Sequence, residues 1–114
     1  MKKLSLVISV YNEEAVLEKF YKAFCSIEQD LKYGGYELIF VNDGSTDASM
    51  RILESIAQQN KSVRVISFSR NFGHEAAMIA GIDYAVGDVI ICMDADLQHP
   101  LECITPIMEK FEEG

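Results

Sequence analysis

The sequence predicts an α/β fold in which a parallel sheet of alternating β-α units is covered by helices on both faces, in three α/β/α layers. Two observations support this class. Four short apolar runs alternate with four segments in which apolar residues recur at helical spacing. Strands joined through helices in this way are parallel, with right-handed crossovers. Residues 1–114 are expected to form a single domain.

The first half of the chain contains two strands and two helices. The continuous apolar run Leu4–Val10 predicts a strand buried inside a sheet, and residues 36–41 predict a second. Between them, residues 16–31 have the pattern of an amphipathic helix, which two glycines end at positions 34 and 35. The polar residues 42–47 combine a turn with a helix N-cap, and the second helix follows with an apolar stripe of Met50, Leu53, Ile56 and Ala57.

The second half repeats this alternation. Residues 63–68 predict a third strand, and residues 89–93 predict a fourth, buried on both faces. A final helix is expected over residues 100–113, broken or restarted at Thr105-Pro106. The helix between the third and fourth strands carries small residues that would let it lie close to the sheet or to a ligand: Gly73, Ala76, Ala77, Ala80 and Gly81.

Acidic side chains follow three of the four strands. Glu13 comes after the first, Asp43 after the second, and Asp94 and Asp96 after the fourth. A Rossmann-like strand order of 3-2-1-4 would bring the first and fourth strand ends into one crevice at the carboxyl edge, where such sheets bind ligands. Asp94 and Asp96 could converge there on one hard divalent cation. Simpler explanations remain open, because such acids also cap helices or hydrogen-bond their own turns.

Composition and missing motifs exclude several classes of partner. The formal net charge of −8 argues against direct binding to nucleic acid or an anionic membrane, since both require a basic patch. The sequence has no dinucleotide fingerprint and no P-loop, so a phosphate ligand would have to be held through a metal ion. No signal peptide or membrane-spanning run is evident. Cys25, Cys92 and Cys103 are expected to be reduced, buried thiols of a cytoplasmic protein.

Four motifs in this order resemble glycosyltransferase family 2. They are VISVYNEE at residues 7–14, VNDGSTD at 41–47, RNFGH at 70–74 and MDADLQHP at 93–100. Within the family, the chain is most similar to the polyprenyl-phosphate sugar transferases, such as dolichyl-phosphate mannosyltransferase and bactoprenol glucosyltransferase. Ser9 departs from the pattern, because the family usually has proline there.

This resemblance implies a GT-A fold that binds a nucleoside diphosphate sugar, either a UDP-sugar or a GDP-sugar, for metal-dependent, inverting transfer. By position, Asp43 would contact the base and Arg70 would lie near the nucleotide or its phosphates. The remaining residues expected beside the nucleotide sugar are Tyr11, Asn12, Glu13, Asp94 and Ala95. Asp94, Asp96 and Gln98 would hold Mg²⁺ or Mn²⁺. His74 and His99 are interpreted as loop or helix-start residues.

The acceptor and the catalytic base are not identified by these residues. The resemblance implies a lipid phosphate or a saccharide as acceptor, and any base carboxylate would lie beyond residue 114. We therefore expect a fragment of a longer enzyme, inactive alone, able to self-associate, and located in the full-length protein at the cytoplasmic face of the membrane. The alternatives are a non-catalytic nucleotide-binding or assembly module and a receiver-type phosphoacceptor domain. A receiver domain would need an aspartate after the third strand, where Phe68, Ser69 and Arg70 stand.

Overall fold

A computed structural model of the protein describes residues 3–28, 35–95, 104 and 106–110. Within these residues, four strands alternate with three helices in the predicted order. Residues 104 and 106–110 are also helical, in agreement with the predicted final helix. The bounds of the elements are β1 (Leu4–Val10), α1 (Leu17–Glu28), β2 (Tyr36–Asn42), α2 (Ser49–Gln59), β3 (Val63–Ser67), α3 (His74–Tyr84) and β4 (Val89–Asp94).

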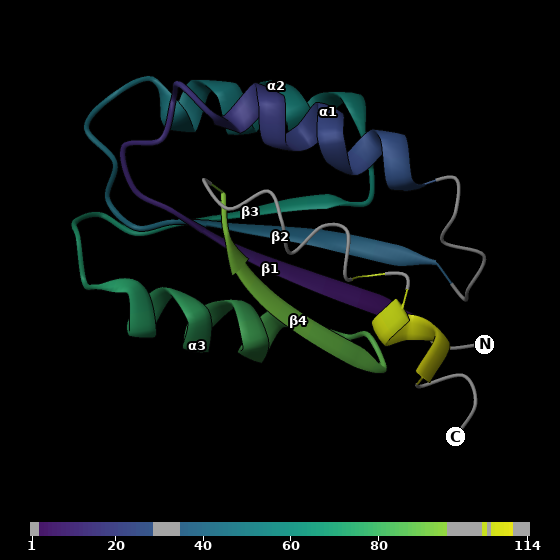
Figure 1. Ribbon diagram of the computed structural model, residues 1–114. Coiled ribbons are helices and arrows are strands. Elements are labelled where there is room, and N and C mark those ends of the chain that lie inside the picture. Colours follow the sequence, from purple (N-terminus) through teal and green to yellow (C-terminus); the bar gives the residue numbers. More distant parts are fainter. Residues whose placement is uncertain (1–2, 29–34, 96–103, 105, 111–114) are drawn as a thin grey trace.

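The sheet has the predicted strand order, β3-β2-β1-β4, and every neighbouring pair is parallel. Helices α1 and α2 lie on one face of the sheet and α3 lies on the other, which confirms the three-layer α/β/α class (Figure 1). The register places Ser9 of β1 opposite Asp94 of β4. The order of the strands therefore brings the ends of β1 and β4 together, as expected for a site at the carboxyl edge.

The core has two parts because β1 and β2 are covered on both faces. The part under α1 and α2 is the larger, and it includes the rings of Phe20 and Phe40, whose centroids lie 6.2 Å apart. The part under α3 contains Val7, Ile39, Val41 and Ala77. A Cβ atom at Gly81 would lie 2.3 Å from Val7 Cγ1, so the small residue lets α3 approach the sheet closely.

The prediction that β4 is buried on both faces is wrong. Val89 and Met93 are buried, whereas Ile90 and Cys92 are exposed. β4 is the edge strand of the described sheet, and α3 packs against β1 and β2, so one face of β4 is not covered by α3. The expectation of buried thiols fails at Cys92 for the same reason.

Two of the three cysteines lie among the described residues. Cys25 is half-buried, and both Cys25 and Cys92 are free thiols, whereas Cys103 lies outside the described residues. Across the ranges that the structure describes, no helix combines the length and the apolar character needed to cross a membrane.

Candidate functional site

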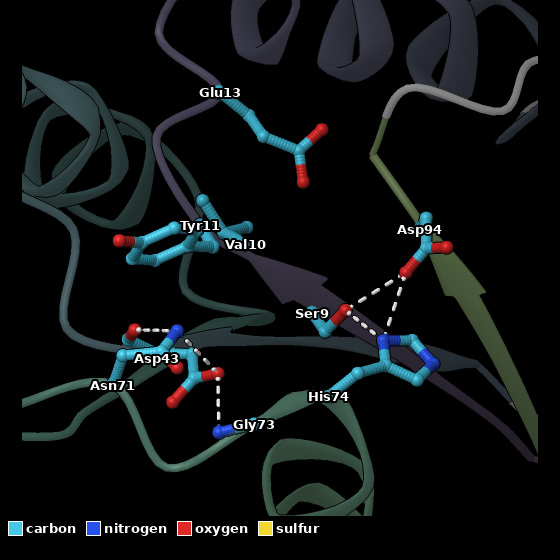
Figure 2. A pocket seen from close by; sticks show the side chains of 9 residues that line it. All are labelled: Ser9, Val10, Tyr11, Glu13, Asp43, Asn71, Gly73, His74 and Asp94. Atoms are coloured by element: carbon cyan, nitrogen blue, oxygen red, sulfur yellow. Dashed lines mark hydrogen bonds and ion pairs between the residues drawn. The ribbon is translucent and has the colours of Figure 1, made fainter.

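A pocket of about 380 Å³ opens at the carboxyl edge of the sheet (Figure 2). Its walls come from the end of β1, the end of β2, the β3–α3 loop with the start of α3, and the end of β4. Four of the predicted site residues line it, which are Tyr11, Glu13, Asp43 and Asp94. The remaining lining residues are Ser9, Val10, Asn71, Gly73 and His74.

Asp43 forms one wall and is almost completely buried, with 3% of its surface exposed. Its Oδ1 accepts a hydrogen bond from the backbone N–H of Phe72 at 2.8 Å, and its Oδ2 accepts one from the N–H of Gly73 at 3.0 Å. The side-chain amide of Asn71 also donates to Oδ2, at 3.1 Å. The carboxylate therefore fixes the β3–α3 loop, and a contact with a base would have to share these acceptor oxygens.

The β3–α3 loop also approaches the backbone at Gly44. This glycine has a φ of +72°, and a Cβ atom there would lie 2.3 Å from the carbonyl carbon of Arg70. The Arg70 guanidinium lies over the Phe72 ring, 4.7 Å from its centroid. Arg70 is exposed and does not line the pocket, so the structure does not bring it together with the four lining residues.

Asn12 is placed outside the pocket, where it joins two loops. Its Oδ1 accepts a hydrogen bond from the backbone N–H of Thr46 at 2.7 Å, and its own N–H donates to Ser45 Oγ at 3.0 Å. Its φ of 51° lies in the left-handed region, which asparagine tolerates better than most residues. Asn12 therefore supports the pocket by holding the β1–α1 loop against the β2–α2 loop.

The next two residues of the β1–α1 loop continue this connection. The N–H of Glu13 donates to Ser49 Oγ at 3.0 Å, and the N–H of Glu14 donates to Asp47 Oδ2 at 3.2 Å. Asp47 also accepts a hydrogen bond from the N–H of Ser49 at 2.9 Å. Burial alone would raise the pKa of Asp47, but the hydrogen bonds from Ser49 and from backbone N–H groups outweigh it and lower that pKa.

Tyr11 and Glu13 line the pocket from the segment that follows β1 (Figure 2). The Tyr11 side chain is 47% exposed, so its ring offers an apolar surface to a ligand. Ala95, in contrast, is buried in the core under α1 and α2 with 1% of its surface exposed. Any contact of Ala95 with a nucleotide sugar would therefore have to come from its backbone.

Three side chains meet at the wall formed by β1 and β4. Ser9 Oγ donates a hydrogen bond to Asp94 Oδ1 at 2.9 Å and lies 2.9 Å from His74 Nδ1. His74 Nδ1 is 3.2 Å from the same Asp94 oxygen (Figure 2). Ser9, His74 and Asn71 were not predicted as site residues. Two features of the sequence could have identified two of them. Ser9 departs from the family pattern, and His74 directly follows Gly73 at a helix start.

The predicted metal ligands are described only in part. Asp94 lies in the pocket wall, whereas Asp96 and Gln98, like His99, lie outside the described residues. Among the residues that are described, no group of three or more His, Cys, Asp and Glu side chains could hold a metal ion. The donor type is nevertheless suitable, because Asp94 presents carboxylate oxygen to the pocket, and Mg²⁺ and Mn²⁺ prefer oxygen ligands.

An open parallel sheet with an acidic pocket at its carboxyl edge defines a Rossmann-like, ligand-binding α/β domain. The family model for Glycosyl transferase family 2 matches residues 5–114. The chain belongs to glycosyltransferase family 2.

Similar proteins come from bacteria and from a phage. The chain is 47% identical over 110 residues to the uncharacterized glycosyltransferase YkcC of Bacillus subtilis, covering 96% of this chain and 34% of that protein. It is 45% identical over 112 residues to the bactoprenol glucosyl transferase of Shigella phage SfV, covering 98% of this chain and 36% of that protein. The chain thus spans about a third of the length of these relatives.

Solved glycosyltransferase structures share the fold. Residues 1–349 of Staphylococcus aureus TarS in complex with UDP-GlcNAc match with a TM-score of 0.73 at 22% identity, over 95% of this chain and 31% of that TarS chain. The mannosyltransferase PcManGT of Pyrobaculum calidifontis, in complex with GDP-Man and Mn²⁺, matches with a TM-score of 0.74 at 21% identity, over 83% of this chain and 28% of PcManGT. At these identities the likeness concerns the fold alone, and it confirms the GT-A class.

Proposed function

We propose that this domain binds the nucleoside diphosphate sugar donor of a metal-dependent, inverting glycosyltransferase. The observation that carries the proposal is the acidic pocket between the ends of β1 and β4, with Asp94 in its wall. The donor class is supported by the UDP-GlcNAc and the GDP-Man with Mn²⁺ bound by two proteins of the same fold. An NMR titration with UDP and GDP distinguishes uracil from guanine as the base.

In this proposal each part of the pocket contacts one part of the donor. The exposed ring of Tyr11 would pack against the base, and Asp43 would hold the loop that shapes the base site. Asp94, together with Asp96 and Gln98, would hold Mg²⁺ or Mn²⁺ beside the diphosphate. A bound divalent ion would stabilise the negative charge that develops on the departing diphosphate.

We further propose that the acceptor is a polyprenyl phosphate. Several similar proteins are named bactoprenol glucosyl transferases, which supports a lipid acceptor. A phosphate acceptor is already ionised near neutral pH, so transfer to it needs no strong general base. Such an acceptor is a membrane lipid, so the proposed reaction takes place at a membrane surface, and we propose the cytoplasmic face.

An NMR titration of the isotope-labelled chain tests donor binding. UDP and GDP are added with and without Mg²⁺, and backbone amide shifts are followed. We expect Mg²⁺-dependent shifts at residues 11–13, 43 and 94–98 for one of the two nucleotides and weaker shifts for the other. Equal shifts with and without Mg²⁺ would contradict metal dependence. No shift with either nucleotide would contradict donor binding by this chain.

The receiver-domain alternative is not supported, because β3 is followed by Phe68, Ser69 and Arg70 and the chain belongs to family 2. A non-catalytic role for this chain is tested by radiolabelled UDP-glucose and GDP-mannose with polyprenyl phosphate in detergent. We expect no transfer by the 114 residues alone and transfer by a chain that includes the remaining length of the relatives. Absence of transfer by the longer chain with every donor and acceptor pair would favour the non-catalytic role.

A further inference from the structure

Ser9 and His74, from two different elements, both approach one oxygen atom of Asp94, Oδ1. Ser9 lies near the end of β1, Asp94 is opposite it at the end of β4, and His74 is the first residue of α3. Ser9 is 6% exposed, whereas the side chains of His74 and Asp94 are 55% and 37% exposed. Asp94 Oδ1 is therefore held from the protein side, at the boundary between the sheet and the pocket.

The direction of each hydrogen bond follows from the available protons. Ser9 Oγ has one proton, and it is donated to Asp94 Oδ1. The contact between Ser9 Oγ and His74 Nδ1 then requires His74 to carry its proton on Nδ1 and Ser9 to accept it. His74 Nδ1 also lies 3.2 Å from Asp94 Oδ1. Ser9 therefore holds this oxygen through a hydrogen bond, while His74 lies beside it and holds the Ser9 hydroxyl.

We propose that Ser9 and His74 are a positioning pair that fixes the rotamer of Asp94 through Oδ1 and leaves Oδ2 available to a divalent cation. This inference rests on the proposed metal-dependent function. Within the described part of the chain, the hydrogen bond and the ion pair of the Asp94 side chain both involve Oδ1. Hydrogen-bond partners of this kind orient a metal ligand, and their loss typically weakens metal affinity about 10- to 100-fold.

The hydroxyl at position 9 is the group that makes this arrangement possible, because it donates to Asp94. Proline, which the family usually has at this position, has no hydroxyl and could not donate to Asp94. In Ser9 the donor comes from a strand that pairs directly with β4, so its position relative to Asp94 is set by the sheet register. A serine at this position therefore adds a rigid restraint on the carboxylate that a proline could not supply.

Two pairs of variants separate positioning from a general structural role. Ser9→Ala and His74→Ala remove the donors, whereas Ser9→Thr keeps the hydroxyl and His74→Asn keeps an N–H donor near the place of Nδ1. Binding of Mn²⁺ to the chain in the presence of UDP or GDP is measured from the loss of the free-ion EPR signal. We expect each alanine variant to bind Mn²⁺ about tenfold more weakly, with the conservative variants close to wild type. The thermal midpoints should remain similar.

A measurement without metal checks the rotamer directly. Three-bond couplings across the Asp94 Cα–Cβ bond should indicate one χ1 rotamer in the wild type and averaging in Ser9→Ala and His74→Ala. Equal Mn²⁺ affinity in all variants, or averaged couplings in the wild type, would overturn the positioning pair. If the wild type binds no Mn²⁺, the proposed metal-dependent function fails instead, and the couplings still decide whether Ser9 and His74 fix Asp94.

Discussion

The side-chain amide of Asn71 donates to two oxygens of Asp43, to the carbonyl oxygen at 3.2 Å and to carboxylate Oδ2 at 3.1 Å. These hydrogen bonds join the loop after β2 to the loop before α3. The buried carboxylate also accepts the N–H groups of Phe72 and Gly73, so one wall of the pocket is organised around a single aspartate. An acceptor that is this fully occupied is expected to matter for stability as well as for ligand binding.

Replacing Asp43 with asparagine tests the contribution of this carboxylate to stability. The variant keeps the shape of the side chain, but one acceptor oxygen becomes an N–H₂ group that faces backbone or side-chain donors. We expect the free energy of unfolding to fall by about 1.5 to 3 kcal/mol, the range for hydrogen bonds to charged groups. Urea denaturation monitored by circular dichroism measures it. Asp83→Asn, an exposed position on α3, serves as control and should change the value by less than about 0.5 kcal/mol.

We predict that any side chain at position 44 lowers the free energy of unfolding. Gly44→Ala would place a Cβ atom 2.3 Å from the Arg70 carbonyl carbon while keeping a φ of +72°. Gly35→Ala is a matched control, because Gly35 has a φ of +106° but open space around its Cβ position. We expect Gly35→Ala to cost about 1 to 2 kcal/mol from backbone strain alone. Gly44→Ala should cost about 1 to 3 kcal/mol more, and equal costs in thermal or urea unfolding would contradict the close approach.

The sequence predicted the fold class, and the hypothesis of a Rossmann-like strand order then gave the position of the pocket. Apolar periodicity identifies strands and helices locally, and the right-handed crossover rule restricts how parallel strands can be arranged. These two rules leave the strand order open. The Rossmann-like order 3-2-1-4 places the ends of β1 and β4 side by side, and the structure has that order. Asp94 and Glu13 could therefore be assigned to one pocket before any loop conformation was known.

Loop contacts and edge exposure could not be predicted in the same way. The hydrogen bond from the Thr46 N–H to Asn12 depends on a left-handed backbone conformation at Asn12. The hydrogen bonds of Asp43 depend on the conformation of the β3–α3 loop, which is distant in the sequence. The meeting of Ser9 with His74 joins residues 65 positions apart. The exposure of Cys92 depends on which strands α3 covers, and apolar content alone does not indicate that.

A second buried carboxylate lies at the opposite end of the sheet. Glu37 is 3% exposed, and its Oε2 accepts hydrogen bonds from Ser5 Oγ at 2.5 Å and from the Val86 N–H at 2.7 Å. Its Oε1 lies 3.7 Å from Arg64 Nε. Burial alone would raise the pKa of Glu37, but these hydrogen bonds and the nearby charges of Arg64 and Lys3 outweigh it and lower the pKa below 4.5.

This lowered pKa predicts an acid-sensitive contribution to stability. A carboxylate whose pKa is lower in the folded state stabilises the fold above the unfolded value of 4.5, and the contribution is lost as the pH falls through the lower folded value. We expect Glu37→Gln to cost about 1 to 3 kcal/mol at pH 7 and less near pH 3. Urea denaturation at both pH values measures this, with the exposed Glu54→Gln as control. A cost that does not depend on pH would contradict the assignment.

Self-association of the 114-residue chain is predicted from its apolar surface. Large apolar side chains are exposed on α3, on β4 and on the segment between them, namely Ile79, Ile82, Tyr84, Val86 and Ile90. Such surfaces favour association, and an edge strand adds unpaired backbone groups. Sedimentation equilibrium should show an average mass that rises with concentration. Ile79→Lys should reduce the rise and Gln58→Lys, on exposed α2 surface, should not. A constant monomer mass for the unmodified chain would contradict this prediction.

Replacing Asp94 with asparagine tests the proposed metal site most directly. The exposed carboxylate contributes a negative charge and an oxygen ligand to the pocket, and asparagine removes the charge while keeping an acceptor for Ser9. We expect the Mg²⁺-dependent part of UDP or GDP binding to weaken at least tenfold in isothermal titration calorimetry, because a neutral amide is a poorer ligand for a hard cation. The thermal midpoint should stay within a few degrees of wild type, and Asp83→Asn should bind as wild type does. Unchanged Mg²⁺ dependence in Asp94→Asn would show that the cation is held elsewhere.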